Sequence, residues 1–282
     1  MGKAFCKVIF IPFLKVAVSC KMTFTQNYLH PQDFLPVHVS AAAYCQGKGI
    51  RYNSNKHRLN KYFLKMDLRS FFPSIKQADV ESHIRKYLTD IDESDLSDMT
   101  RILIWSDKGS RQLSVGAPSS PFFSNSVVYE LDVMLHEFCE AHGVVYTRYA
   151  DDLVFSTNKP GILGGVERYV NTAIRLLEYP RLRVNRQKTI HTSIGRGVVV
   201  TGINITHERS LSIGRDRKRE IRAAVHHFIN SRLDYSEVQK LHGLLAFAYD
   251  IEPSFINSLM KYYGNDLLTN IRKYLSQSDS SN

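Results

Sequence analysis

The chain has 282 residues, of which 43% are hydrophobic, so it is long enough to bury a sizeable core as one large domain or as two or three subdomains. Its 37 Lys and Arg outnumber its 27 Asp and Glu, and the net charge of +10 favours a polyanionic partner, because neutralising phosphates releases counterions. The 4 cysteines include no CxxC pair, which argues against a zinc site or a disulfide framework and favours a reducing cytoplasm.

The chain starts with an apolar run that Pro12 and Lys15 interrupt. The run is too short for the core of a secretory signal and falls well below the roughly 18 residues of a membrane span. We therefore expect a strand over Lys7–Ile11, ended by Pro12, and no membrane association. At the other end, the Ser-, Asp- and Asn-rich tail after Leu275 is expected to fray.

The next segments predict a mixture of strands and helices. The run Lys61–Leu68 is apolar and aromatic enough for a buried strand. Helical spacing follows in 74–88, with Ser74 as a candidate cap, and again in Asp92–Trp105. The segment 120–143 predicts one long amphipathic helix closed by Gly143.

Two strand-like runs, 144–150 and 153–157, flank an adjacent pair of aspartates, and so short a link predicts a β-hairpin. A helix is expected over Gly164–Glu178, followed by strands in 181–185 and 197–205. The character of the chain changes near Thr206–Gly214, and from Arg215 onward it is helical and at first strongly basic. This change marks a candidate subdomain boundary.

The adjacent aspartates, Asp151 and Asp152, have two interpretations. Asp is common in turns, so the pair could form a polar loop. Alternatively, two carboxylates at the edge of a cleft cannot both stay ionised cheaply without a cation, and Mg²⁺ prefers such oxygen ligands. Asp67, which ends its predicted strand, is the candidate third carboxylate of a two-metal phosphoryl-transfer site, with ions roughly 3.5–4 Å apart.

Several ordered blocks resemble a reverse transcriptase. "YADD" on the predicted hairpin follows "DLRSFFPSI" and "GAPSSP" in the order and at the spacing of that family. The bacterial retron branch is most similar, on "YTRYADDLVFS", "VTG" at Val200–Gly202, "KVIFIPFLK" near the start and "AYCQGKGIRYNSNKH" at Ala43–His57. The resemblance runs from about Lys7 to about Gly264.

The resemblance implies a catalytic role for the carboxylates. Asp67, Asp151 and Asp152 would ligate two Mg²⁺ ions, with Mn²⁺ as a possible substitute, and the Leu68 carbonyl would help to hold the ion on the nucleotide side. Lys188, within "NRQKTI", matches a lysine near the leaving pyrophosphate and is a candidate general acid. One more phosphate-binding lysine in a basic protein is the alternative for Lys188.

Residues matching the nucleotide site follow from the same resemblance. Phe72 matches an aromatic gate that leaves no room for a 2′-hydroxyl, whereas its neighbour Phe71 is expected in the core. Arg69 would donate to the incoming triphosphate, or lie solvated at the surface. The turn at Gly116, Ala117 and Pro118 would let backbone approach the nucleotide, although Ser114 and Val115 replace the family's usual Pro-Gln.

Basic and polar residues match RNA-binding positions of the family. Asn53 and His57 match a retron-typical block, in which Ser54 replaces an alanine, and His57 could equally be a structural hydrogen-bonding residue. Lys7 and Lys15 fall where the fingers offer basic groups to the triphosphate. On the helix that begins the thumb, the RNA-backbone candidates are Arg215, Arg217, Lys218 and Arg222.

The implied architecture is α+β, a right-hand polymerase fold with the catalytic β-hairpin in its palm. Fingers are expected over 1–60 and 76–112, palm over 61–75 and 113–207, and a helical thumb over 208–282.

A retron-type enzyme would copy a cognate structured non-coding RNA with dNTPs, starting from an RNA 2′-hydroxyl, into RNA-linked single-stranded DNA. The resemblance also implies anti-phage defence with a separately encoded effector protein. A group II intron-type or other bacterial reverse transcriptase is the alternative enzyme, and a non-catalytic RNA-binding scaffold is the alternative from another class.

Overall fold

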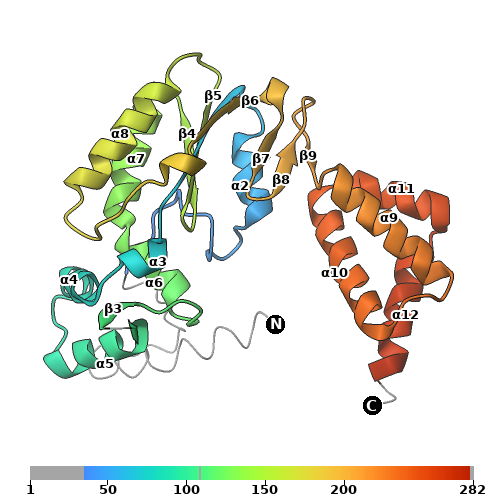
Figure 1. Cartoon of the computed structure of the whole chain (residues 1–282), viewed down its shortest axis with the longest axis horizontal. Helices are drawn as coiled ribbons and strands as arrows, with labels where there is room; N and C mark the ends of the chain where they lie inside the picture. The colour runs from blue at the N-terminus through green and yellow to red at the C-terminus, as the bar shows by residue number, and fades with distance from the viewer. Residues whose placement is uncertain (1–34, 108, 280–282) are drawn as a thin grey trace, which may run out of the picture. The chain divides into compact units, whose positions relative to one another are not determined.

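The computed structural model describes residues 35–107 and 109–279. The expected strand at Lys7–Ile11, with Lys7 and Lys15, lies outside the described residues. The chain divides into two compact units, Met1–Ser193 and Ile194–Asn282 (Figure 1). This division falls before the change of composition near Thr206. The finer assignment of fingers, palm and thumb stays a prediction.

The first unit is built on a four-stranded antiparallel sheet in the order β4-β5-β1-β6. The strands are β1 (Tyr62–Asp67), β4 (Val145–Tyr149), β5 (Asp152–Thr157) and β6 (Ile190–Ser193). The expected strand at 61–68 and the expected hairpin are thus confirmed. Between β4 and β5, Ala150 has φ 56°, in the left-handed region that a residue with a side chain rarely adopts.

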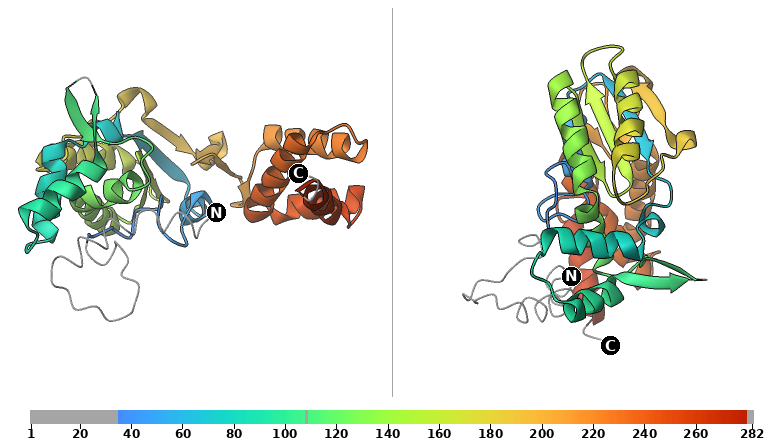
Figure 2. Two further views of the ribbon diagram at one scale, coloured as in Figure 1. Left: turned by 90° about the horizontal axis from the view of Figure 1, so that it is seen from below. Right: turned by 90° about the vertical axis from the view of Figure 1, so that its left-hand side faces the viewer.

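Helices cover both faces of this sheet (Figures 1 and 2). The helices α7 (Tyr129–His142) and α8 (Leu163–Leu176) lie on one face, and α2 (Ile50–His57) lies on the other. Since side chains alternate along a strand, Tyr146 and Phe155 stack with ring centroids 4.9 Å apart on the α7 side, while Thr147 and Ser156 face α2. Burial of the apolar set on the α7 side forms the main core.

The face toward α2 is held by a buried polar network. The two ring nitrogens of His57 lie 2.7 Å from Ser156 Oγ and 2.7 Å from Thr147 Oγ1, and the Thr147 hydroxyl also donates to Asn53. Asn53 and His57 are both 0% exposed. Because both side chains are enclosed within the unit, an RNA contact of Asn53 or His57 has no support from their placement and stays a prediction. The contacts of His57 with Ser156 and Thr147 agree with the alternative interpretation, a structural hydrogen-bonding residue.

The remainder of the first unit connects these layers. Its elements are α3 (Phe71–Ser74), α4 (Gln77–Tyr87), α5 (Glu93–Leu103), β2 (Ile104–Asp107), β3 (Ser110–Leu113) and α6 (Ser120–Val127). Ser74 is not the cap of the following helix, because α4 begins at Gln77 and its N-cap residue is Lys76, whose N–H donates to Asp79 Oδ2 at 2.7 Å. Trp105 lies in strand β2 and not in the expected helix, which ends at Leu103.

Two further expectations are wrong. The segment 120–143 forms α6 and α7 instead of one helix, because the Val128 backbone, at φ −104° and ψ 16°, leaves the helical region. The segment 181–185 is not a strand, since only Val184 forms an isolated bridge, with Leu68. Its neighbours bond to the end of β1 instead, through Arg69 N to Arg183 O at 2.8 Å and Asn185 N to Asp67 O at 2.7 Å.

The second unit combines a small sheet with a helical bundle. The antiparallel strands β7 (Val198–Val200), β8 (Ile203–Ile205) and β9 (Leu211–Ser212) precede the helices, so the expected strand run at 197–205 is a hairpin. The helices are α9 (Arg215–Ile229), α10 (Tyr235–Ile251), α11 (Pro253–Tyr263) and α12 (Leu267–Asp279). None of the helices in 35–107 and 109–279 has the length and apolar character needed to cross a membrane.

The buried imidazole of His57 predicts a loss of stability in acid. Burial lowers the pKa of His57 from 6.5 to about 3, so the unfolded chain takes up a proton below about pH 6.5 that the folded chain refuses until about pH 3. Stability is therefore lost as the pH falls through this window, by about 2 kcal/mol at pH 5 from His57 alone.

Urea unfolding at pH 7.5 and pH 5 checks this expectation. The variant His57→Gln should lose less stability between the two pH values than the wild type, although His83, whose burial lowers its pKa to about 4, keeps part of the effect. His226→Gln, which removes an exposed imidazole on α9, is the matched control. An equal loss in His57→Gln and wild type would contradict the assignment.

Candidate active site

Three carboxylates lie at one end of the central sheet. Asp67, the last residue of β1, is the register partner of Asp152, the first residue of β5. Directly opposite residues in an antiparallel pair have Cβ atoms about 4.5–5.5 Å apart, on the same face. The Leu68 N–H donates to the Asp151 carbonyl at 2.9 Å, so the turn itself is bonded to the end of β1. The fold thus brings together the three aspartates that the sequence singled out.

The surroundings disfavour negative charge on the turn. Burial raises the pKa of Asp151, and the charge of Asp67 raises it further, against a lowering effect of Lys188. Burial also raises the pKa of Asp152, followed by the charges of Asp151 and Asp67. This end of the sheet is therefore a concentration of mutually repelling carboxylates, which a cation would relieve.

Asp67 is held by two residues of one short segment, which includes the 3-10 turn η2 (Arg186–Lys188). Lys188 Nζ lies 2.8 Å from Asp67 Oδ2, and Asn185 Nδ2 donates to Asp67 Oδ1 at 3.2 Å. The hydrogen bond that Lys188 donates to Asp67, and then the negative charge of Asp67, raise the pKa of Lys188, whose side chain is 64% exposed. Lys188 therefore stays protonated at neutral pH beside the carboxylates.

The sequence analysis did not identify Asn185 as a residue of this site. It binds Asp67 with both its backbone N–H and its side-chain amide. The available signal was its place at the head of "NRQKTI", three residues before Lys188.

The donor set fits a hard cation by its chemistry. The three aspartates and the Leu68 carbonyl offer oxygen ligands only, the kind that Mg²⁺ prefers. Within the described ranges, no group of three or more His, Cys, Asp or Glu side chains is already arranged to hold a metal ion. The positive charge paired with Asp67 in this structure is the Lys188 ammonium.

The short helix α3 follows β1 directly and carries the aromatic pair. Phe71 is 3% exposed and lies in the core, as expected, while Phe72 is partly buried against it with ring centroids 5.5 Å apart. Arg69 is exposed, and its N–H donates to Arg183 O at 2.8 Å. Phe72 and Arg69 thus lie within five residues of Asp67, on the segment that follows the carboxylate end of β1.

The turn of Gly116, Ala117 and Pro118 joins β3 to α6. Gly116 has φ 88°, which favours glycine, although an added Cβ would meet nothing within 4 Å. Glycine is therefore favoured at position 116 by its backbone conformation, and not because a side chain would clash with a neighbour.

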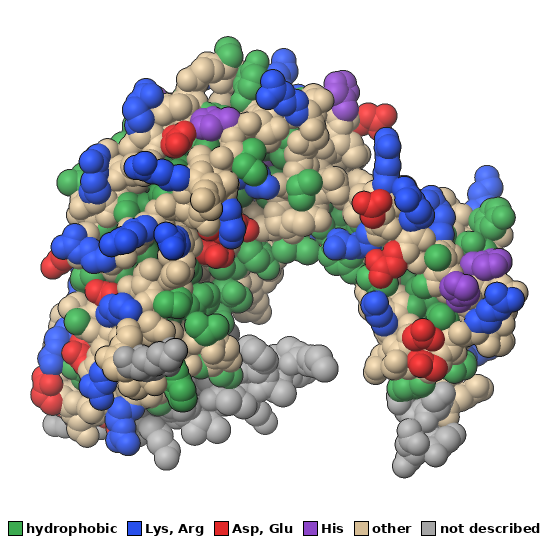
Figure 3. All heavy atoms as spheres, in the orientation of Figure 1, with side chains coloured by type: hydrophobic (Ala, Val, Ile, Leu, Met, Phe, Trp, Pro, Cys, Tyr) green, Lys and Arg blue, Asp and Glu red, His purple; other side chains and the backbone are tan. Residues whose placement is uncertain are grey.

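In the second unit, several basic residues of α9 contact an acidic or aromatic side chain of the same unit. Lys218 Nζ lies 2.5 Å from Glu252 Oε1, which neutralises its charge within the unit. The guanidinium groups of Arg217 and Arg222 lie over the rings of Phe247 and Phe255, at 4.9 and 5.1 Å from their centroids. Arg215 and Arg222 are exposed, and Figure 3 shows Lys and Arg side chains gathered over the α9 region of this unit.

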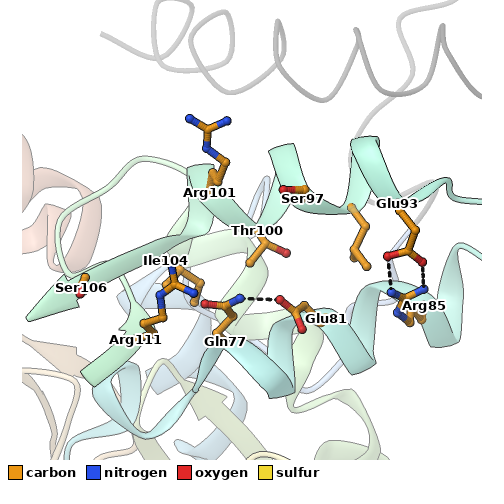
Figure 4. Close-up of a pocket in the computed structure, with 11 residues that line it drawn as sticks. Gln77, Glu81, Arg85, Glu93, Ser97, Thr100, Arg101, Ile104, Ser106 and Arg111 are labelled. Atoms are coloured by element: carbon orange, nitrogen blue, oxygen red, sulfur yellow. Dashed lines mark hydrogen bonds and ion pairs between the residues drawn. The ribbon is translucent and has the colours of Figure 1, made fainter. Parts of the chain in front are cut away.

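A separate pocket lies between α4, α5 and the β2–β3 hairpin (Figure 4). Two pairs of its polar side chains bond to each other, Arg85 with Glu93 and Gln77 with Glu81. Its lining includes none of the predicted site residues. The pocket is therefore not part of the candidate active site.

Comparisons with known proteins identify the family of this chain. A family profile described as reverse transcriptase (RNA-dependent DNA polymerase) matches residues 16–222. The retron Ec83 reverse transcriptase of Escherichia coli is 37% identical over 242 residues, which cover 84% of this chain and 78% of that protein. The retron Ec73 reverse transcriptase of Escherichia coli is 32% identical over 263 residues, which cover 88% of this chain and 82% of that protein.

Among solved structures, a telomerase from Candida albicans, in complex with a TWJ fragment of telomeric RNA, aligns with a TM-score of 0.50 and 10% identity. The alignment covers 96% of this chain and 48% of that one, so the chain spans about half the length of that telomerase. At this identity the likeness concerns the fold alone, and it is consistent with the right-hand polymerase fold expected from the sequence. The family match and the two retron relatives show that this chain belongs to the reverse transcriptases, as an RNA-directed DNA polymerase of the bacterial retron type.

Proposed function

We propose that this polymerase uses Asp67, Asp151 and Asp152 to hold two Mg²⁺ ions, and copies a cognate structured RNA into single-stranded DNA that stays linked to RNA. The observation that carries the catalytic part is the register of β1 with β5, which sets Asp67 opposite Asp152 at the turn that bears Asp151. The printed names of the retron relatives support the RNA-templated part.

The bound metal ions would lower the pKa of the attacking hydroxyl and stabilise the leaving pyrophosphate. The protein's part is positioning and charge. Asn185 and the β1–β5 pairing fix the orientation of Asp67. Lys188, protonated and largely exposed, is the group that would give a proton to the pyrophosphate oxygen.

Nucleotide selection is assigned to the segment after β1. The ring of Phe72 would lie under the sugar and exclude a 2′-hydroxyl, and Arg69 would donate to the triphosphate. The backbone at Gly116, Ala117 and Pro118 would approach the base pair. For the RNA, the exposed Arg215 and Arg222 of α9 are the stronger candidates for backbone contacts, followed by Arg217, while Lys218 is already paired.

The remaining parts of the proposal extend the retron-type assignment. Synthesis would start from a 2′-hydroxyl of the RNA and give a branched product. The role would be anti-phage defence in the cytoplasm, together with a separately encoded effector protein. A group II intron-type enzyme would give an unbranched product, and a non-catalytic RNA-binding scaffold would give none.

The double variant Asp151→Asn with Asp152→Asn tests catalysis. Asn keeps the size of each side chain but removes the charge that holds the metal, so we expect primer extension on an RNA template with Mg²⁺ to fall by on the order of 1,000-fold. Asp98→Asn, at an exposed position of α5, is the matched control and should keep wild-type activity. Activity that survives the double change would refute the catalytic assignment.

A smaller side chain at position 72 should relax the choice of sugar. In Phe72→Ala, we expect the preference for dNTPs over rNTPs, measured as the ratio of kcat/KM values, to fall by about tenfold or more, because the space for a 2′-hydroxyl is opened. Phe122→Ala, which removes another partly buried ring of the same core, controls for loosened packing. An unchanged ratio in Phe72→Ala would argue against the gate.

The nucleic acid that co-purifies with the wild-type protein tests the retron product. We expect single-stranded DNA whose gel mobility changes after RNase treatment but not after protease treatment, because it is joined to RNA and not to protein. The double aspartate variant should carry the RNA without the DNA. Linear, unbranched DNA would favour the alternative enzyme class.

A further inference from the structure

We propose that the buried ion pair of Arg148 with Asp132 is a positioning unit, which sets the shape of the turn that carries Asp151 and Asp152. This inference rests on the proposed metal-binding role of those carboxylates. It assigns a task to two residues that neither touch substrate nor belong to the carboxylate set.

The pair is fully buried, and two nitrogens of Arg148 donate hydrogen bonds to the Asp132 carboxylate. Both side chains are 0% exposed, and Arg148 Nη2 lies 2.6 Å from Asp132 Oδ2 while Arg148 Nε lies 2.9 Å from Oδ1. Arg148 is in β4, on the sheet face toward α7, and Asp132 is in the first turn of α7. The hydroxyl of Tyr146 donates to Asp132 Oδ1 at 2.7 Å, which completes the carboxylate's partners on the side away from the turn.

The other edge of the guanidinium reaches the catalytic turn. Arg148 Nη1 donates to the Ala150 carbonyl at 3.1 Å and to Asn125 Oδ1 at 3.0 Å. Ala150 is the residue with φ 56°, a conformation that needs support from its surroundings when the residue is not glycine. Because Asp151 and Asp152 follow at once, the direction of both carboxylates depends on this conformation.

The backbone of Arg148 is fixed as firmly as its side chain. Its N–H donates to the Ser40 carbonyl at 2.8 Å, and its carbonyl accepts from the Ala42 N–H at 2.8 Å. Asn125 Nδ2 donates to the Ala43 carbonyl at 2.7 Å, which ties the same segment to the partner of the guanidinium. Both the backbone and the guanidinium of Arg148 are therefore held by hydrogen bonds, which fix the position from which Nη1 donates to the Ala150 carbonyl.

Stability alone does not account for the pair. Replacing a buried ion pair with apolar side chains of similar size is often neutral or stabilising, because two charges no longer have to be desolvated. An apolar pair could fill this space, but it could not donate to the Ala150 carbonyl. The feature that an apolar pair lacks is the contact with the turn.

The test separates packing from positioning. In the triple variant Arg148→Met, Asp132→Leu and Tyr146→Phe, the ion pair is replaced by apolar side chains and no hydroxyl is left facing an absent carboxylate. We expect a folded protein with a lowered melting temperature, because the buried Ala150 carbonyl and Asn125 Oδ1 lose their donor. We also expect a roughly tenfold higher Mg²⁺ concentration for half-maximal primer extension and a lower kcat, since the carboxylates are no longer held in place. Mn²⁺ affinity of the protein, measured by EPR titration, should weaken in parallel.

Two further variants keep the proposal falsifiable. Arg148→Lys retains a charge opposite Asp132 but lacks the planar fork that reaches Asp132, Asn125 and Ala150 together, so it should show the same raised metal requirement in a folded protein. Tyr146→Phe alone removes one bond of Asp132 away from the turn, and its metal requirement should equal that of the wild type.

Wild-type Mg²⁺ dependence and Mn²⁺ affinity in a folded triple variant would overturn the proposal, as would the same result in Arg148→Lys if the triple variant does not fold. An effect in Tyr146→Phe as large as in Arg148→Lys would also overturn it, because general loosening would then explain both. The proposed function fails separately, by activity that survives Asp151→Asn with Asp152→Asn.

Discussion

The antiparallel pairing of β1 with β5 is the interaction on which the rest of the site depends. It sets Asp67 opposite Asp152, although the two residues are far apart in the chain. A slip of one residue would turn Asp67 to the opposite face of the sheet and would also expose apolar side chains of β1. The core positions Leu64 and Met66, which face α7 and α8, therefore fix the register that assembles the carboxylates.

Gathering negative charge at one sheet end has an electrostatic cost, and the structure offsets it in distinct ways. Lys188 neutralises Asp67 from an exposed side chain, and Asn185 holds the same carboxylate without charge. The turn is supported from beneath by Arg148, whose own charge is matched by Asp132 away from the solvent. The partner of Asp67 is thus exposed to solvent, whereas the pair that contacts the turn is fully buried.

In the second unit, the basic residues of α9 differ in their surroundings, because some are paired or packed inside the unit and others are exposed. Glu252, at the junction of α10 and α11, accepts from Lys218 Nζ, from Ser212 Oγ at 2.8 Å and from the Ile213 N–H at 3.2 Å. One carboxylate thus joins β9 to two helices. Lys218 serves the internal architecture of this unit, whereas the exposed Arg215 remains available to a polyanion.

The sequence by itself determined the family, the strand that ends on Asp67, the hairpin around Asp151 and Asp152, and most of the helices. These features are local: a strand alternates, an amphipathic helix repeats, and the polymerase blocks follow one another in a recognisable order. Only the tertiary structure decided the burial of Asn53 and His57, the break at Val128, the irregular course of 181–185 beside the end of β1, and the contacts of Asn185 and Arg148. The physical reason is the same for each, because the partner that settles the conformation or the charge comes from another part of the chain, and neither propensity nor spacing reveals it.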